Sequence, residues 1–550
     1  MQVVLSTYFR RNRWLAAAFI AFLTPGLMSQ LCFAQQDCAK LTAMTLTDAK
    51  ITSAELVPAA VDKTPSLLGL PQELTLPAYC RVQAMATPTP DSQIKFELWL
   101  PTEDWNGEYL QLGNGGLAGS INVVALKEPL SHHFAVAATD DGHQGAGTDG
   151  SWALGHPEKI IDFGYRAVHL TNVHSREIIA AFYHHPERYA YFNGCSEGGR
   201  EAIMEAQRFP TDFNGILAGS PAHAWLDVMA DFAWNSQALL KDPASYIPEA
   251  KRPAIEKAAL TACGTQQGVS DPFIKDPQSC RFDPSVLLCK SGDSNDCLTD
   301  PQLTALKKIY SGAKTPAGKS ISSGYEAGAE AEPGPPGISY ASYIYGPAPN
   351  ASLALIFSSS FYGNFVLDQP KFSSLNLDFD KDITLADKKL GGVLNATNPD
   401  LRAFKAHGGK LIQYHGWYDG SPAPLQSVDY FLDVTHKMGG EAKVLSFYRL
   451  FMAPGMMHCA LGPGPNAFGD MVDSSHAGDP ARDIFAALRH WVEDGTAPEQ
   501  IIATKYMHDL PTQPVIMTRP LCPYPQQAIW DQKGDTNQAS NWACKATPSK

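Results

Sequence analysis

The sequence predicts an α/β protein whose parallel-sheet core is interrupted by a long insertion. Short β-rich runs alternate with helical patterns from about residue 92 to 220, and this alternation resumes after about residue 400. The stretch between them has few strand signals and a turn-rich segment at residues 333–337. At 550 residues, the chain is long enough for one large domain with such an insertion.

The first part of the core should contain four strands and a helix. The strands are expected at residues 109–112, 133–138, 189–193 and 213–219, and the helix at residues 199–209. After the insertion, strands are expected at residues 410–414 and 443–450, and a helix at residues 481–493. Apolar residues recur at helical spacing in that last segment, and Gly495 follows it as a stop signal.

The composition and net charge of the chain make some classes of binding partner unfavourable. Apolar residues make up 44% of the chain, which is enough to bury a large core. The chain has 43 Lys and Arg against 56 Asp and Glu, a net charge of −13. Such a surface repels phosphate backbones and anionic lipid, so we expect neither nucleic acid nor membrane as a partner.

Residues 1–34 have the features of a secretory signal peptide. Positive charges at residues 10–13 precede an apolar run at residues 14–23, and small residues allow cleavage before Gln35. The run is shorter than the roughly 20 residues that a membrane span needs. The arginine pair also allows a twin-arginine signal. We expect the mature protein to be secreted or periplasmic.

The cysteines agree with export. The chain has 11, and loss of Cys32 with the signal leaves an even number. There is no CxxC pair and no cysteine–histidine cluster at zinc spacing, so a cysteine-rich metal site is not expected. Spacing leaves the pairing open, although Cys263/Cys280 and Cys289/Cys297 are close enough for local loops.

Gly194-Cys195-Ser196-Glu197-Gly198 matches the G-x-S-x-G nucleophile elbow, in which a serine occupies a tight turn between a strand and a helix. The pattern is short, but a β-like run precedes it and a helical pattern follows. An oxyanion hole needs the N–H after the serine, on Glu197, and a second N–H from a glycine-rich loop. We assign the second to Gly116, with Gly115 as the alternative.

A serine hydroxyl needs a histidine base and an acid that orients it, in the order Ser…Asp…His for this type of site. Asp419 follows the strand expected at residues 410–414, and His458 follows the strand expected at residues 443–450. His415 is the competing base, but it precedes the acid. Because Cys195 adjoins the serine and Cys459 adjoins the histidine, a disulfide between them would hold the two together.

These residues resemble the CS-D-HC signature of the tannase and feruloyl esterase family, which includes hydrolases of terephthalate monoesters. The resemblance covers nearly the whole mature chain and includes motifs at residues 105–107, 113–116, 194–200, 280–284, 415–417 and 458–459. It implies an α/β-hydrolase core at residues 35–222 and 401–550, with a lid domain at residues 223–400 between nucleophile and acid. It also implies four more disulfides: Cys38–Cys80, Cys263–Cys280, Cys289–Cys297 and Cys522–Cys544.

Two departures from the family pattern concern ligands. Many members hold calcium in a lid loop with three aspartates, whereas here only Asp271 remains, with Gly264 and Gln267 in the other places. Calcium prefers six to eight oxygen ligands, so we expect no metal or cofactor. The second departure is the absence of an arginine: the family's Phe-Phe-Arg-Tyr segment has one, but residues 360–365 of this chain do not. A substrate with a free carboxylate is therefore disfavoured.

The sequence thus predicts a secreted serine carboxylesterase that acts on small esters of phenolic acids, of feruloyl or tannin type, with Ser196, Asp419 and His458 as the triad. The aromatic side chains of Phe361, Tyr362 and Phe365 are expected to face the substrate ring. The alternatives are a terephthalate-monoester hydrolase and a catalytically silent binding protein with the same fold. The oligomeric state is left open.

Overall fold

The structure is a computed structural model, and it describes residues 38–472 and 476–546. The predicted signal peptide lies outside the described residues. In the described part of the chain, no helix is both long and apolar enough to cross a bilayer.

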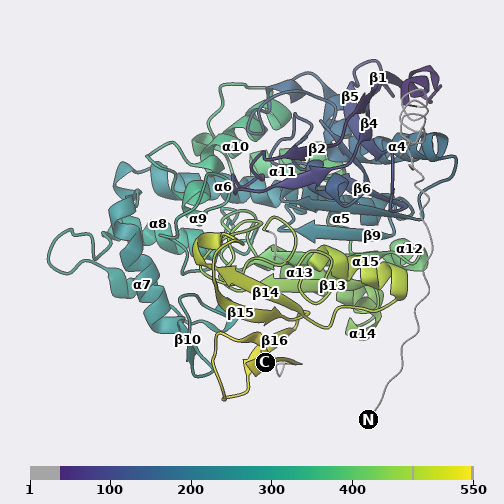
Figure 1. Ribbon diagram of the computed structural model, residues 1–550. Helices are drawn as coiled ribbons and strands as arrows, with labels where there is room; N and C mark the ends of the chain where they lie inside the picture. The colour runs from purple at the N-terminus through teal and green to yellow at the C-terminus, as the bar shows by residue number, and fades with distance from the viewer. Residues whose placement is uncertain (1–37, 473–475, 547–550) are drawn as a thin grey trace, which may run out of the picture.

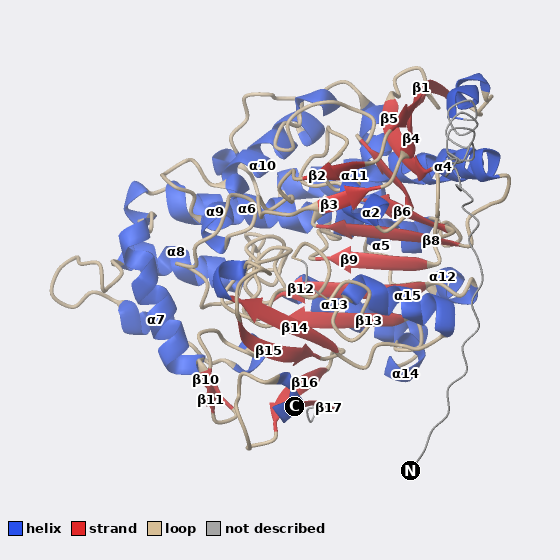
Figure 2. Ribbon diagram, viewed as in Figure 1, coloured by secondary structure: helices blue, strands red, loops and turns tan. Residues whose placement is uncertain are grey.

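A nine-stranded mixed sheet forms the centre of the molecule (Figure 2). In spatial order its strands are β1 (Ala49–Val57), β4 (Tyr79–Ala86), β5 (Ile94–Pro101), β7 (Ala135–Thr139), β6 (Glu108–Leu112), β8 (Tyr189–Cys195), β9 (Gly215–Gly219), β12 (Lys410–Gly416) and β13 (Tyr448–Ala453). The strands from β7 to β13 run parallel, and β1, β4 and β5 extend the sheet antiparallel. The predicted α/β class is confirmed.

The sheet is covered on both faces by helices. One face packs against α4 (Ala167–Tyr183), α5 (Glu197–Arg208) and α13 (Leu425–Met438), and the other against α2 (Lys127–Ser131) and α15 (Ile484–Asp494). The parallel strands are apolar on both faces because both are buried. The shorter helices of the core are α3 (Pro157–Ile161), α12 (Arg402–Ala406) and α14 (Glu441–Val444).

Residues 223–400 contribute no strand to the nine-stranded sheet. Their helices lie beyond the carboxyl ends of the parallel strands (Figure 1). They are α6 (Trp225–Leu240), α7 (Arg252–Cys263), α8 (Asp300–Ser311), α9 (Tyr340–Ile344), α10 (Leu353–Phe361) and α11 (Lys381–Leu394). This insertion therefore covers the edge of the sheet where Ser196 and His458 lie.

Four two-stranded sheets and several short turns complete the described chain. The pairs are β2 (Ala60–Asp62) with β3 (Leu74–Leu76), β10 (Thr265–Gln266) with β11 (Val269–Ser270), β14 (Ile501–Tyr506) with β15 (Val515–Leu521), and β16 (Gln526–Trp530) with β17 (Trp542–Ala546). Two π-helical turns are η3 (Asp162–Arg166) and η8 (Tyr362–Val366). The 3₁₀ turns are η1 (Leu41–Ala43), η2 (Ser151–Ala153), η4 (Pro243–Ser245), η5 (Glu249–Lys251), η6 (Pro277–Ser279), η7 (Pro284–Leu287), η9 (Ser374–Asn376), η10 (Met507–Asp509) and η11 (Ala539–Asn541).

One expected strand is placed wrongly by the sequence pattern. The segment at residues 443–450 was expected to be a strand, but its start belongs to the short helix α14, and β13 begins at Tyr448. The strand starts where Tyr448 pairs with Leu411 of β12. The apolar run continues to Ala453, so hydrophobicity alone does not show where pairing begins.

Candidate active site

Ser196 occupies a strained turn between β8 and α5. Its backbone has φ 66° and ψ −118°, a conformation that side-chain-bearing residues rarely adopt. Its N–H donates to the carbonyl of Gly219 on β9 at 3.0 Å. A Cβ on Gly194 would lie 2.6 Å from the backbone of Gly198, so the turn closes only with glycine there. This geometry is that of a nucleophile elbow.

His458 and Asp419 form a buried pair on the loops after β13 and β12. The Nδ1 atom of His458 lies 3.0 and 2.9 Å from the two carboxylate oxygens of Asp419. Burial alone would raise the pKa of Asp419, but the neighbouring His458 and His415 hold that pKa below its ordinary value. Asp419 is therefore ionised and accepts hydrogen bonds, as an orienting acid must.

His415, the competing base, lies on the other side of Asp419. Its Nε2 atom is 3.2 Å from the Asp419 carboxylate, and its Nδ1 atom is 2.6 Å from the hydroxyl of Ser427. The ring is fully buried and does not line the cavity that contains Ser196 and His458. His415 thus supports the acid, and His458 is the histidine that faces the serine side of the cavity.

Cys195 and Cys459 form a disulfide, with Cα atoms 6.0 Å apart across a sequence separation of 264. The bond joins the nucleophile turn directly to the loop that carries His458. The structure also contains the four other pairs that the resemblance implies: Cys38–Cys80, Cys263–Cys280, Cys289–Cys297 and Cys522–Cys544.

The loop at residues 113–116 lies against the start of α5. The Gly198 N–H donates to the carbonyl of Asn114 at 2.8 Å, which fixes the loop beside the elbow. Within the described residues, the N–H groups of Glu197, Gly115 and Gly116 donate to no protein acceptor. Gly116 has φ 63°, and a Cβ there would lie 2.4 Å from a backbone oxygen, so this position requires glycine. These amides are free to bind an oxyanion.

A cavity of about 1260 Å³ contains Ser196 and His458 in its wall. One side is apolar and comes from the lid. It consists of Trp225, Val228, Met229 and Phe232 from one face of α6, Tyr343 from α9, and Leu353 and Phe357 from α10. The Tyr343 ring packs edge-on against the His458 ring, with centroids 5.3 Å apart. The apolar wall therefore adjoins the proposed base.

The prediction that Phe361, Tyr362 and Phe365 face the substrate ring is wrong. All three are buried in the lid core and none lines the cavity. At Phe361 the chain turns from α10 into η8, and these rings pack on one another and on Trp152 and Trp225. The residues of α10 that line the cavity are instead Leu353 and Phe357, which lie earlier in the helix. The α6 wall was not predicted, although the i, i+3, i+4, i+7 spacing of its apolar residues is visible in the sequence.

The degenerate calcium loop is filled by the side chains of the protein itself. The Asp271 carboxylate is 3.0 Å from Arg519 and 3.4 Å from Lys275. The Lys275 ammonium also donates to the carbonyls of Gln266 and Val269 at 2.8 and 2.9 Å. The oxygens that remain in this loop are already bound by cationic side chains, so the residues present do not fit a calcium ion.

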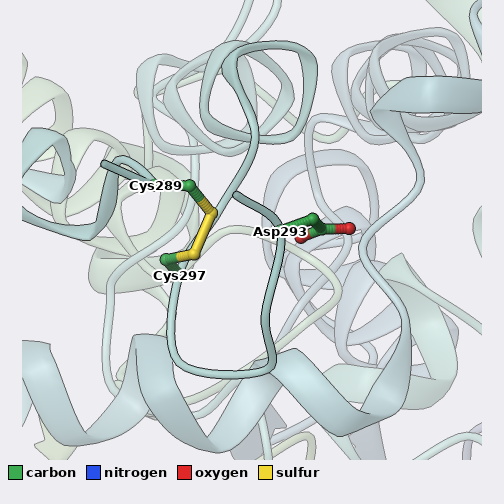
Figure 3. Close-up of side chains that lie close together, drawn as sticks. All are labelled: Cys289, Asp293 and Cys297. Carbon is green, nitrogen blue, oxygen red and sulfur yellow. A yellow bond between two sulfur atoms is a disulfide. The ribbon is translucent and has the colours of Figure 1, made fainter. Parts of the chain in front are cut away.

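A second group of metal-type ligands is also engaged within the protein. Figure 3 shows the Cys289–Cys297 disulfide with Asp293 beside it. The two sulfurs are bonded to each other and are not thiolate ligands, and the Asp293 carboxylate pairs with Lys251.

The chain is similar to known proteins over most of its length. Residues 80–545 match the family described as tannase and feruloyl esterase. An uncharacterised esterase of Xanthomonas campestris is 38% identical over 546 residues, which cover 95% of this chain and 93% of the relative. A mono(2-hydroxyethyl) terephthalate hydrolase of Piscinibacter sakaiensis is 32% identical over 545 residues, covering 86% of each chain.

Solved structures agree with the sequence comparison. The crystal structure of feruloyl esterase B from Aspergillus oryzae superposes with a TM-score of 0.83 at 27% identity, covering 93% of this chain and all of that one. The likeness supports the α/β-hydrolase fold expected for the core.

Proposed function

Because the chain belongs to the tannase and feruloyl esterase family of carboxylic ester hydrolases, we propose that it hydrolyses esters of phenolic acids through an acyl-enzyme on Ser196. The observation that carries this proposal is that the nucleophile turn and the histidine–acid pair are covalently linked in one site. A strained serine turn and a His458–Asp419 pair are linked by the Cys195–Cys459 disulfide.

In the proposed reaction, the Ser196 hydroxyl attacks the ester carbonyl while His458 accepts its proton. The same histidine then gives the proton to the leaving alcohol. Asp419 holds His458 through Nδ1 and stabilises the imidazolium that forms. The tetrahedral oxyanion accepts hydrogen bonds from the N–H groups of Glu197 and of Gly116 or Gly115. Water releases the acid in a second cycle with the same groups.

The lid wall supports an aromatic, uncharged acyl group. The rings of Tyr343 and Phe357 both pack on the ring of Phe232, with centroid distances of 5.9 and 6.0 Å. Among the described residues that line the cavity, α6, α9 and α10 contribute no arginine or lysine; Arg489, which lines the core side, belongs to α15 and is paired with Glu108. A terephthalate monoester would place its carboxylate against this wall without a cationic partner.

The terephthalate-monoester alternative is retained because a hydrolase of that class is 32% identical. Hydrolysis of methyl ferulate, methyl gallate and mono(2-hydroxyethyl) terephthalate should be measured side by side. We expect the highest kcat/KM for one of the two phenolic esters. A higher value for the terephthalate monoester would overturn the proposed preference.

Ser196→Ala supplies the control for the mechanism. This variant should fold with an unchanged melting temperature and lose ester hydrolysis down to the residual that the oxyanion hole and binding support. Rapid mixing of the wild-type enzyme with an activated aryl ester should give a burst of alcohol release that Ser196→Ala lacks. Equal turnover by both proteins would refute the assignment of the nucleophile.

We also propose that the protein is exported and works outside the cytoplasm. The five disulfides support this, since such bonds persist in oxidising compartments. Mass spectrometry of the secreted or periplasmic protein should find Gln35 as its first residue. Recovery of the protein only from the cytoplasm would contradict export.

A further inference from the structure

The loop that presents Gly115 and Gly116 is anchored at both ends by buried side chains. At one end, the Asn114 N–H donates to the Glu201 carboxylate at 3.0 Å. At the other end, the carbonyl of Leu117 lies 2.8 Å from Nε2 of His143. The amides proposed to bind the oxyanion therefore lie between two fixed points, one of which is Glu201 on α5.

Glu201 in turn faces a second buried carboxyl group. Asp141 is fully buried and Glu201 is 2% exposed. One carboxyl oxygen from each of Asp141, Glu197 and Glu201 lies within 4.8 Å of the others. Neither oxygen of Asp141, nor Oε1 of Glu201, receives a hydrogen bond from a donor in the described chain. If both carboxyl groups were ionised, they would repel each other with no hydrogen-bond donor between them. Burial outweighs the opposing charge of Arg200 for both groups, so we expect one of them to carry a proton.

The geometry indicates which group carries it. Glu201 accepts the Asn114 N–H, which favours its ionised form, whereas Asp141 has no such donor. Burial and then the charge of Glu201 raise the pKa of Asp141 well above its ordinary value. A protonated Asp141 can donate to Glu201 and satisfy both groups.

The backbone directs Asp141 into this position. Asp141 has φ 59°, in the left-handed region that non-glycine residues seldom occupy. The next residue, Gly142, also has positive φ, and a Cβ there would lie 2.8 Å from the Asp162 side chain. A strained turn after β7 thus holds the Asp141 side chain toward α5.

We propose that Asp141 and Glu201 form a carboxylic acid–carboxylate pair that shares one proton and positions the oxyanion loop. The inference rests on the proposed function, since it assigns a role to the loop in the same reaction. Both are positioning residues, because they act through the Asn114 amide and do not touch the substrate. Loss of the shared proton would place two negative charges side by side and push Glu201 away from the loop.

The other charged groups around the pair do not replace this proton. Arg200 is fully buried, but its guanidinium donates to Glu197 and to the carbonyls of Phe163 and Gly164. Glu197 and Glu205 on α5, and Asp162 on η3, add only acidic groups nearby. Burial lowers the pKa of His143 to about 4, so its ring is neutral at pH 7. Alkaline pH should therefore reduce kcat through Asp141.

The test compares Asp141→Asn, Asp141→Leu and Glu205→Gln with the wild type on one aryl ester, from pH 6 to 10. Asparagine tolerates the left-handed backbone and donates an amide N–H to Glu201 without titrating. We expect Asp141→Asn to keep kcat near the wild-type value at pH 7 and to lose the alkaline fall. Asp141→Leu should lower kcat about 10- to 100-fold with KM nearly unchanged, since the loop shifts by a fraction of an ångström.

Glu205→Gln, one turn further along α5, is the matched control for loss of a buried acid and should keep the wild-type pH profile.

Two outcomes would overturn the pair while leaving the esterase intact. The first is an Asp141→Asn profile identical to that of the wild type. The second is an Asp141→Leu enzyme that folds and matches Glu205→Gln in kcat. If Ser196→Ala retains wild-type turnover in the same assay, the proposed function fails instead, so the two failures are distinguishable.

Discussion

At the scale of single residues, the candidate site depends on three donors that surround one buried carboxylate. Asp419 accepts from His458, from the N–H of Ser421 at 2.6 Å, and from His415. These contacts keep the acid charged and fix its direction, although it is almost completely buried. The tautomer of His458 is then set by the Asp419 contact, with Nε2 left as the acceptor for the serine proton.

Asp419→Asn tests this arrangement. The amide keeps the size of the side chain but favours the wrong histidine tautomer and cannot stabilise an imidazolium. We expect kcat to fall by about 10⁴, with a smaller change in KM. Steady-state kinetics would show this, with Asp433→Asn on the exposed side of α13 as the control. A loss of less than tenfold would remove Asp419 from the mechanism.

At the scale of elements, the loop that carries His458 is held by constraints outside regular secondary structure. Cys459 and Leu461 both have φ near 60°, and the His458 N–H donates to the carbonyl of Ile338 in the lid at 3.2 Å. The Cys195–Cys459 bond adds a covalent link to the end of β8. The base is therefore positioned by the lid and the disulfide together.

Removal of that disulfide should affect catalysis more than stability. In Cys195→Ala/Cys459→Ala the His458 loop loses its tether, and a misplacement of around 1 Å can cost roughly 100-fold in rate. The loop-closure model assigns such a long link about 5 kcal/mol, an amount that native-state strain often reduces. Because four other disulfides remain, we expect a folded protein.

The measurement is kcat together with a thermal melt. Cys289→Ala/Cys297→Ala, which opens a link across only 8 residues in the lid, is the control and should leave kcat unchanged. Unchanged turnover in the first variant would show that the bond does not position the base.

In the lid loop at residues 264–276, the Lys275 ammonium donates to two backbone carbonyls. Lys275→Met should lower the free energy of unfolding, because the carbonyls of Gln266 and Val269 lose their charged hydrogen-bond donor. Each lost hydrogen bond should cost about 1–3 kcal/mol. Chelators should not change the melting temperature of the wild type. Lys257→Met, on the exposed side of α7, is the control. A chelator-induced fall in melting temperature that calcium reverses would show that the loop binds metal after all.

At the scale of the whole molecule, many acidic side chains are buried or half-buried and have raised pKa values. Burial raises the pKa to about 6 for Asp227 and Asp483, about 7 for Asp140, Asp231, Glu326, Glu330 and Glu332, and about 8 for Glu197. Unfolding lets these groups ionise near their ordinary pKa of about 4. Between those values the folded state binds more protons than the unfolded state, so stability falls as pH rises.

The free energy of unfolding should therefore be higher near pH 5 than near pH 8. The contribution of these acids is fully present below about pH 4 and is lost as pH passes through their folded pKa values, about 6 to 8. Denaturant unfolding at constant ionic strength measures the slope. Glu330→Gln should reduce it, whereas Glu441→Gln, an exposed control, should not. A stability that rises from pH 5 to 8 would contradict this account.

The sequence alone predicted those parts of the site whose residues are neighbours along the chain. The triad was assigned from the order of serine, acid and histidine along the chain. The elbow glycines and the cysteines next to Ser196 and His458 are local patterns. Such patterns reflect backbone requirements of a few consecutive residues, which a single sequence displays.

Tertiary structure decided which side chains meet from distant segments. The cavity wall of α6, the pairing of Asp271 with Lys275 and Arg519, and the closeness of Asp141 to Glu201 each join residues from separate elements. The lid aromatics show the same limit, because the sequence pattern could not tell that Phe357 lines the cavity while Phe361 lies in the core. Apolar periodicity marks the buried face of a helix, but what that face is buried against is set only when the elements pack.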